Sequence, residues 1–146
     1  MDTIFLINKS YIDEDDILIK IEKVAQNLNL KYTNEEYDLI LTTVEFDDYI
    51  TFGGLSLGYF NETLQGNNFI DGYGCEMSIE YRYESTILLP FLKEFLKEYP
   101  DMLIYKETGK ALNNPFVFNK NHLENFSGTD SYAFLGNPPQ DLSNLA

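Results

Sequence analysis

The sequence predicts an α+β fold, with an antiparallel or mixed sheet and two main helices packed on one face. The strongest observation is a change of hydrophobic period between residues 76 and 107. Residues 77–83 alternate between apolar and polar side chains, which is typical of a half-buried strand. Apolar residues then recur three and four positions apart up to residue 99, and this spacing predicts a helix with one apolar face. Residues 102–106 (MLIYK) predict a second strand.

The helix of this unit has recognisable limits. Pro100 should end it, because proline has no N–H with which to continue the hydrogen-bond ladder. Ser85 or Thr86 is expected to cap its start. Pro90 suggests that the regular helix begins near Leu89, and we expect residues 91–99 to be helical. Leu92 and Phe95 lie on the apolar face and are expected in the core.

The N-terminal third predicts a central strand at residues 3–8 (TIFLIN) and then a helix from Ile17 to Leu28. Asp13 is a suitable N-cap, and the acids at positions 14–16 would favour the positive end of the helix dipole. These acids therefore have a structural explanation. The alternative is that they form a contact surface for a cationic partner.

The middle of the chain predicts strands without helices. Residues 34–38 are polar and acidic and predict a loop, whereas residues 38–44 (DLILTTV) predict a strand. Gly53 and Gly54 separate residues 49–52 from residues 55–60, which predicts a hairpin with a two-residue turn.

The C-terminal part predicts a short strand at residues 116–118 and one or two helical turns within residues 119–126. We expect a single α+β domain at residues 1–126 and a C-terminal arm at residues 127–146 that packs on it. Helices alternate with strands only at the two ends of the order, and hairpins fill the middle. This order is typical of ferredoxin-like folds with extra hairpin strands.

The net charge of −14, from 24 acidic and 10 basic residues, limits the partners that the chain can bind. Nucleic acids and anionic membrane surfaces require Lys and Arg, so both are unfavourable partners. A basic protein is a favourable one, because opposite charges steer association. The alternative is that the acidity only keeps the protein in solution.

The N-terminus and the cysteine content predict a cytoplasmic protein. The single cysteine, Cys75, excludes an intramolecular disulfide. The first residues contain an apolar run of only four and an acid at position 2, unlike a signal peptide or a membrane span. The oligomeric state is left open.

A catalytic set is hard to assemble from this sequence, and we expect no enzymatic activity, metal or cofactor. His122 is the only histidine and lies in a polar segment. Cys75 precedes Glu76, whose charge opposes formation of a thiolate. We expect both residues to be dispensable for function. One Cys and one His exclude a zinc site of the usual kind, and the acids near Asp13 do not match a calcium-binding loop.

Two functions remain, and the first is binding of a basic protein. Tyrosines lie among the acids, and tyrosine is favoured at the centre of protein interfaces. The expected contact residues are Glu35, Glu36, Tyr37, Asp38, Glu45, Asp47, Asp48 and Tyr49. The alternative is a small enzyme or ligand-binding domain with carboxylates and tyrosines in a cleft. Such a site would show a pocket with a carboxylate of raised pKa.

A family resemblance favours the first function. The segments MSIEYRY (77–83), FLKEFLKEYPD (91–101) and MLIYKETG (102–109) resemble the strand–helix–strand end of several immunity proteins encoded beside bacterial polymorphic toxins. The resemblance implies that the chain neutralises a cognate toxin by binding it, with an acidic surface over a basic active site. No individual functional residue is carried over from it.

Overall fold

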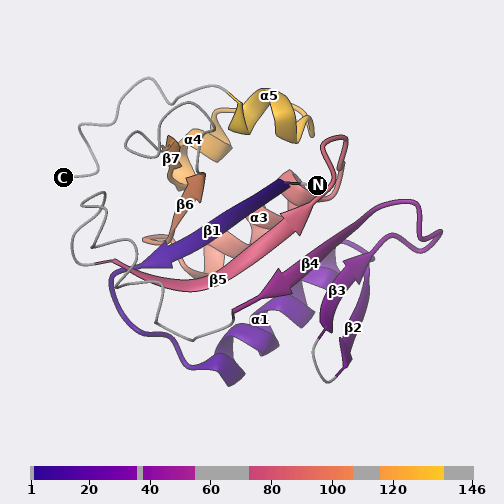
Figure 1. Ribbon diagram of the computed structural model, residues 1–146, viewed down its shortest axis with the longest axis horizontal. Coiled ribbons are helices and arrows are strands. Elements are labelled where there is room, and N and C mark those ends of the chain that lie inside the picture. Colours follow the sequence, from indigo (N-terminus) through magenta and orange to yellow (C-terminus); the bar gives the residue numbers. More distant parts are fainter. Residues whose placement is uncertain (1, 36–37, 55–72, 107–115, 137–146) are drawn as a thin grey trace.

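The computed structural model describes residues 2–35, 38–54, 73–106 and 116–136 (Figure 1). The strands are β1 (Asp2–Asn8), β2 (Lys31–Glu35), β3 (Asp38–Thr42), β4 (Tyr49–Gly53), β5 (Gly74–Tyr81), β6 (Leu103–Lys106) and β7 (Phe116–Phe118). The helices are α1 (Glu14–Asn27), α3 (Leu88–Glu98), α4 (Lys120–Glu124) and α5 (Ser131–Leu135). These elements confirm the predicted α+β class.

All seven strands form one sheet in the order β2-β3-β4-β5-β1-β6-β7, and every neighbouring pair is antiparallel. β1 is central, as predicted, and lies between β5 and β6, the two strands that α3 connects (Figure 1). The ferredoxin-like order stays a prediction. The β2–β3 hairpin extends the sheet at one edge, and β7 extends it at the other.

The main core lies between the sheet and helices α1 and α3, which contact each other. Ile4 and Leu6 of β1 are fully buried in it. The predicted apolar face of α3 is also fully buried, including Leu92 and Phe95. The Phe95 ring lies between two aromatic neighbours, with centroid distances of 5.2 Å to Phe91 and 5.1 Å to Tyr99. α3 therefore contributes aromatic contacts to the core: the Phe91 and Phe95 rings are stacked, and the Tyr99 ring is tilted against that of Phe95.

The start of α1 explains part of the acidity near the N-terminus. Asp13 occupies the predicted N-cap position, although its side chain makes no cap hydrogen bond, and Glu14, Asp15 and Asp16 fill the first turn. The Tyr99 hydroxyl donates to Asp16 Oδ2 over 2.5 Å and so ties α1 to the end of α3. These carboxylates favour the helix dipole, and one of them also joins the two main helices.

The predicted arm contributes to the core through α5, a helix that was not predicted. Phe134 and Leu135 are buried, and the Phe134 ring lies 4.7 Å from that of Phe118 in β7. Tyr132, in the same helix, is 69% exposed. The predicted strand β7 and the predicted helical turns of α4 are both confirmed.

The loop predicted at residues 34–38 is wrong at Asn34 and Glu35, and residues 36–37 lie outside the described part of the chain. Asn34 and Glu35 belong to β2 and pair with Leu39 and Asp38 of β3. The polar composition indicated a loop because a strand was expected to have one buried face. In β2, every described residue except Tyr32 is exposed. β2 lies at the edge of the sheet, where polar side chains on both faces are favourable.

One further prediction about the central strands is wrong, and another falls partly outside the described residues. β5 begins at Gly74 and ends at Tyr81, so Tyr83 lies beyond it and is 53% exposed instead of pointing into the core. β4 pairs with β3 on one side and with β5 on the other. The second arm of the hairpin predicted around Gly53 and Gly54, at residues 55–60, lies outside the described residues.

Glu76 is buried because β5 contains a β-bulge. The register changes from Leu6↔Met77 to Ile7↔Cys75, which leaves Glu76 as the extra residue. Strict alternation would place Glu76 on the polar face, but it is only 3% exposed. Its carboxylate accepts the Ile12 N–H, and its Oε2 has no hydrogen-bond partner among the described residues. Burial raises the pKa of Glu76 to about 7.

We expect Phe95→Ala to lower the free energy of unfolding by ~3–5 kcal/mol, because it leaves a cavity at a fully buried site. Urea unfolding followed by circular dichroism measures this. The control is Tyr11→Ala, which removes a 71% exposed ring and should change stability by less than about 0.5 kcal/mol. A loss below about 1 kcal/mol for Phe95→Ala would contradict the assigned core.

Glu76 should make the protein less stable as the pH rises from about 4.5 to about 7. Over this range the folded state holds a proton that the unfolded state has lost, so the free energy of unfolding falls by roughly 3 kcal/mol. Glu76→Gln removes this contribution. Urea unfolding of parent and variant at several pH values isolates it from the other acids, and Glu80→Gln, on an exposed position of the same strand, is the control. Identical pH profiles for parent and Glu76→Gln would rule the effect out.

Candidate partner-binding surface

Three segments meet at the end of the sheet where β5 finishes. They are the β3–β4 turn (residues 43–48), the β5–α3 turn (residues 82–87) and the start of α5 (residues 129–132), on the upper right of Figure 1. Arg82 Nη1 donates to the Asp47 carbonyl over 2.8 Å, and Ser131 Oγ donates to the Ser85 carbonyl over 3.0 Å. These contacts join the segments into one surface, called the loop surface below.

Asp48 anchors the loop surface from beneath. It was expected to contact a partner, but it is only 7% exposed. Its Oδ2 accepts hydrogen bonds from the Thr86 N–H (2.7 Å), the Thr86 hydroxyl (3.1 Å) and the Ser85 hydroxyl (3.3 Å). Ser85 and Thr86 were expected to cap α3, whose N-cap is instead Ile87. A buried carboxylate requires hydrogen bonds, and these donors satisfy Oδ2, whereas Oδ1 is buried without a hydrogen-bond partner among the described residues.

The β3–β4 turn presents an aromatic ring on a rigid backbone. Thr43 Oγ1 accepts the N–H groups of Asp47 (3.2 Å) and Asp48 (3.3 Å) and donates to Asp47 Oδ1 over 2.5 Å. Phe46 adopts a positive φ of 61° and is 64% exposed. Non-glycine residues seldom adopt this conformation, so the surrounding hydrogen bonds must hold it. Lys31 Nζ lies 4.3 Å from the Phe46 ring centroid.

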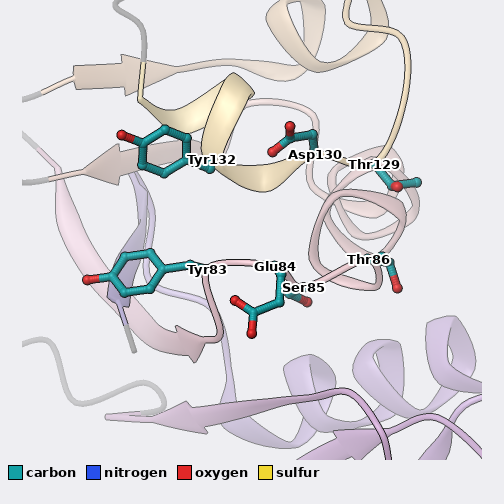
Figure 2. Close-up of a pocket in the computed structure, with 7 residues that line it drawn as sticks. All are labelled: Tyr83, Glu84, Ser85, Thr86, Thr129, Asp130 and Tyr132. Atoms are coloured by element: carbon teal, nitrogen blue, oxygen red, sulfur yellow. The ribbon is translucent and has the colours of Figure 1, made fainter.

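A pocket of about 410 Å³ lies between the β5–α3 turn and α5. Residues 83–86 line one side, and Thr129, Asp130 and Tyr132 line the other. Figure 2 shows the rings of Tyr83 and Tyr132 on opposite sides of the pocket. Two carboxylates, Glu84 and Asp130, and no basic side chain are among the lining residues.

The charge of the loop surface is negative where it is exposed. Its exposed acids are Glu45, Asp47, Glu84 and Asp130. Arg82 Nη2 lies 3.0 Å from Glu84 Oε1, and this hydrogen bond lowers the pKa of Glu84. Aromatic side chains are enriched in protein interfaces, and polar side chains form the rim around them.

The structure divides the predicted contact residues into two groups. Glu45, Asp47, Asp48 and Tyr49 belong to the β3–β4 turn or follow it directly, and of these Tyr49 is half-buried and Asp48 is buried.

Glu35 and Asp38 of the second group lie at the opposite end of β3, roughly 17 Å away for a strand of five residues. There, Glu35 is exposed and Asp38 begins β3, while the Asp38 side chain, Glu36 and Tyr37 lie outside the described residues. Glu35 and the start of β3 are therefore far from the β3–β4 turn, at the other end of the strand.

Several residues of the loop surface were missed by sequence reasoning. They are Phe46, Tyr83, Glu84, Asp130 and Tyr132. One signal for the last two was present, since Asp130 caps α5 through the Ala133 N–H (3.0 Å) and Gly136 follows the helix. An N-cap residue followed by a short apolar run and a glycine predicts a helix. No comparable signal marked Tyr83, because it continued the alternation of β5.

Within the described part of the chain, the features expected of an enzyme do not meet in one place. Glu76, the carboxylate with raised pKa, lies in the bulge near the start of β5, whereas the pocket adjoins the residues that follow its end. His122 forms a capping box with Asn119, whose N–H donates to His122 Nδ1 over 3.0 Å. The Cys75 side chain is not among the described ones.

The described residues contain neither a metal-binding cluster nor a membrane-spanning helix. Across residues 2–35, 38–54, 73–106 and 116–136, no three His, Cys, Asp or Glu side chains gather closely enough to hold a metal ion. In the same part of the chain, no helix has the length and apolarity needed to cross a membrane.

Asp48→Ala should lower the free energy of unfolding by about 2–3 kcal/mol, because it leaves the Ser85 hydroxyl and the Thr86 N–H without their acceptor. Asp47→Ala, in the same turn but exposed, is the matched control and should cost less than about 1 kcal/mol. Urea unfolding measures both, and hydrogen exchange should show faster exchange of the Thr86 amide in Asp48→Ala alone. Equal losses in the two variants would show that Asp48 does not anchor the surface.

No family model, curated protein or solved structure matches the chain.

Proposed function

We propose that this chain binds a basic protein and acts as an immunity protein that neutralises a cognate bacterial toxin by direct binding. The observation that carries the proposal is the loop surface, on which three exposed aromatic rings lie among four exposed carboxylates. The rings are Phe46 (64% exposed), Tyr83 (53%) and Tyr132 (69%). Large exposed rings are costly in isolation and become favourable when a partner covers them.

The rigidity of the surface supports the same proposal. Binding is stronger when the contact residues are already held in place, because less conformational entropy is lost. Asp48 joins the β3–β4 and β5–α3 turns, and Ser131 joins the latter to α5. The three segments can therefore meet a partner as one preformed unit.

The acids have two expected roles in such a complex. Exposed carboxylates at the rim accelerate association and make it sensitive to salt, whereas a carboxylate that becomes buried against Lys or Arg controls dissociation. Glu45 and Asp47 are exposed on the β3–β4 turn and suit the first role. The net charge of −14 favours a basic partner over long distances as well.

The direct experiment uses the protein encoded by the gene next to the one for this chain. The C-terminal domain of that protein is expressed with and without this chain, growth is recorded, and binding is measured by calorimetry with both proteins purified. We expect growth arrest that this chain relieves, together with a tight complex. A neighbour that is harmless or that does not bind the chain contradicts the proposal.

Charge reversal tests which acids take part. Glu45→Lys combined with Asp47→Lys should reduce the association rate by about tenfold at low salt and by much less at high salt. Stopped-flow mixing with the cognate partner measures the rate, and circular dichroism confirms folding. The matched control is Asp15→Lys with Glu22→Lys, the same charge change at exposed positions of α1. Glu35→Lys tests the other end of β3. Equal rates for the first double variant and the parent would exclude the β3–β4 turn from the interface.

A further inference from the structure

We propose that the pocket between Tyr83 and Tyr132 receives an arginine side chain of the basic partner. The inference rests on the proposed function and deepens it, because it names the group that the loop surface recognises. Three features of the pocket carry it: two exposed tyrosine rings, two carboxylates without a basic neighbour in the lining, and a floor fixed by buried hydrogen bonds.

The rings supply the first part of the recognition. Tyr83 follows β5 and Tyr132 belongs to α5, and their rings stand on opposite sides of the pocket (Figure 2). The face of an aromatic ring attracts cations, and a planar guanidinium also stacks on it. A volume of about 410 Å³ leaves room for an arginine side chain between them. Lysine fits less well, because its ammonium is compact and more strongly hydrated.

The carboxylates supply the second part. Glu84 Oε1 accepts from Arg82, and Asp130 Oδ1 accepts the Ala133 N–H. The Glu84 carboxylate also accepts a backbone N–H of its own residue. A carboxylate offers about four acceptor positions, so Glu84 and Asp130 can each accept from a guanidinium as well. Arg82 is not among the lining residues. Its Nη2 donates to Glu84, and its Nη1 donates to the Asp47 carbonyl. Its charge opposes an incoming cation, and the second carboxylate, Asp130, offsets this.

The floor of the pocket supplies the third part. Ser85 is only 2% exposed, and its hydroxyl and carbonyl are engaged by Asp48 and Ser131 respectively. The Thr86 N–H is held by Asp48 over 2.7 Å. The backbone on the Tyr83 side of the pocket is therefore fixed before binding, which reduces the entropy lost when a side chain enters.

The test uses hexa-arginine, hexa-lysine and hexa-citrulline peptides with the full chain. Citrulline keeps the planar shape of arginine and lacks its charge. We expect hexa-arginine to bind about tenfold more tightly than hexa-lysine, and hexa-citrulline to show no measurable binding. Isotope-labelled tyrosines should show chemical-shift changes at Tyr83 and Tyr132 on addition of hexa-arginine.

Variants identify the groups responsible. Tyr83→Ala with Tyr132→Ala should weaken hexa-arginine binding by about tenfold or more, whereas Tyr83→Phe with Tyr132→Phe should retain it, because the rings remain. Glu84→Gln with Asp130→Asn should weaken binding and reduce its dependence on salt, and Asn still caps α5. The matched control is Tyr11→Ala, an exposed tyrosine near the acids of α1, which should bind as the parent does.

Failure of this inference is distinguishable from failure of the proposed function. If the double alanine variant binds hexa-arginine as the parent does, or if the shifts occur at Tyr11 instead, the pocket is not the arginine site. The cognate partner gives an independent result: full protection and unchanged affinity in the double alanine variant would overturn the inference and leave the proposed function intact. Absence of any neutralised partner would overturn the proposed function instead.

Discussion

The Asp48 carboxylate is the contact that determines how this end of the molecule is built. It lies in the β3–β4 turn, yet its hydrogen bonds are all made to the β5–α3 turn. Asp48 is 37 residues from Ser85 and 38 residues from Thr86 in the chain. These hydrogen bonds therefore join two segments that are distant in sequence. The exposed rings of Phe46 and Tyr83 keep their positions because the backbone beneath them is fixed. A polar group inside the fold thus determines a surface outside it.

The acidic residues show why composition alone could not define a binding site. The carboxylates share a charge but have different environments: Asp16 links two helices, Asp48 is buried under hydrogen-bond donors, Glu76 is buried in a bulge, and Glu45 faces solvent. In the sequence, Asp47 and Asp48 are adjacent and look equivalent. Their roles differ because alternate side chains of a turn point in different directions, which depends on backbone angles that the sequence does not state.

Much of the fold could be predicted because periodicity is a local property. The apolar spacing around Phe95 indicated α3, and the alternation that includes Ile79 indicated β5. The errors came where distant contacts decided the outcome. β2 is polar on both faces and forms a strand through its pairing with β3. The alternation of β5 ends two residues before Tyr83, because the chain must turn there to reach α3. Of the candidate site, sequence reasoning indicated Glu45 and Asp47 but missed the tyrosines of the pocket. Tyr83 continued the alternation of β5, and Tyr132 lies in a five-residue helix whose N-cap and following glycine were overlooked.

The central place of β1 has a consequence for how the protein is made. β1 is paired on both edges, by β5 and by β6, and these strands come from residues 74–81 and 103–106. On the ribosome, the residues of β1 are synthesised before β5 or β6. The apolar side chains of β1 (Ile4, Phe5, Leu6 and Ile7) therefore stay without these partners until both strands have been made. Contacts between such distant residues slow folding and leave apolar segments exposed to other chains in the meantime. The β2–β3–β4 segment, by contrast, joins strands that follow one another in sequence and can pair as soon as each is made. The sheet is therefore expected to assemble from one edge towards its centre, and its earliest-made strand to be among the last to pair.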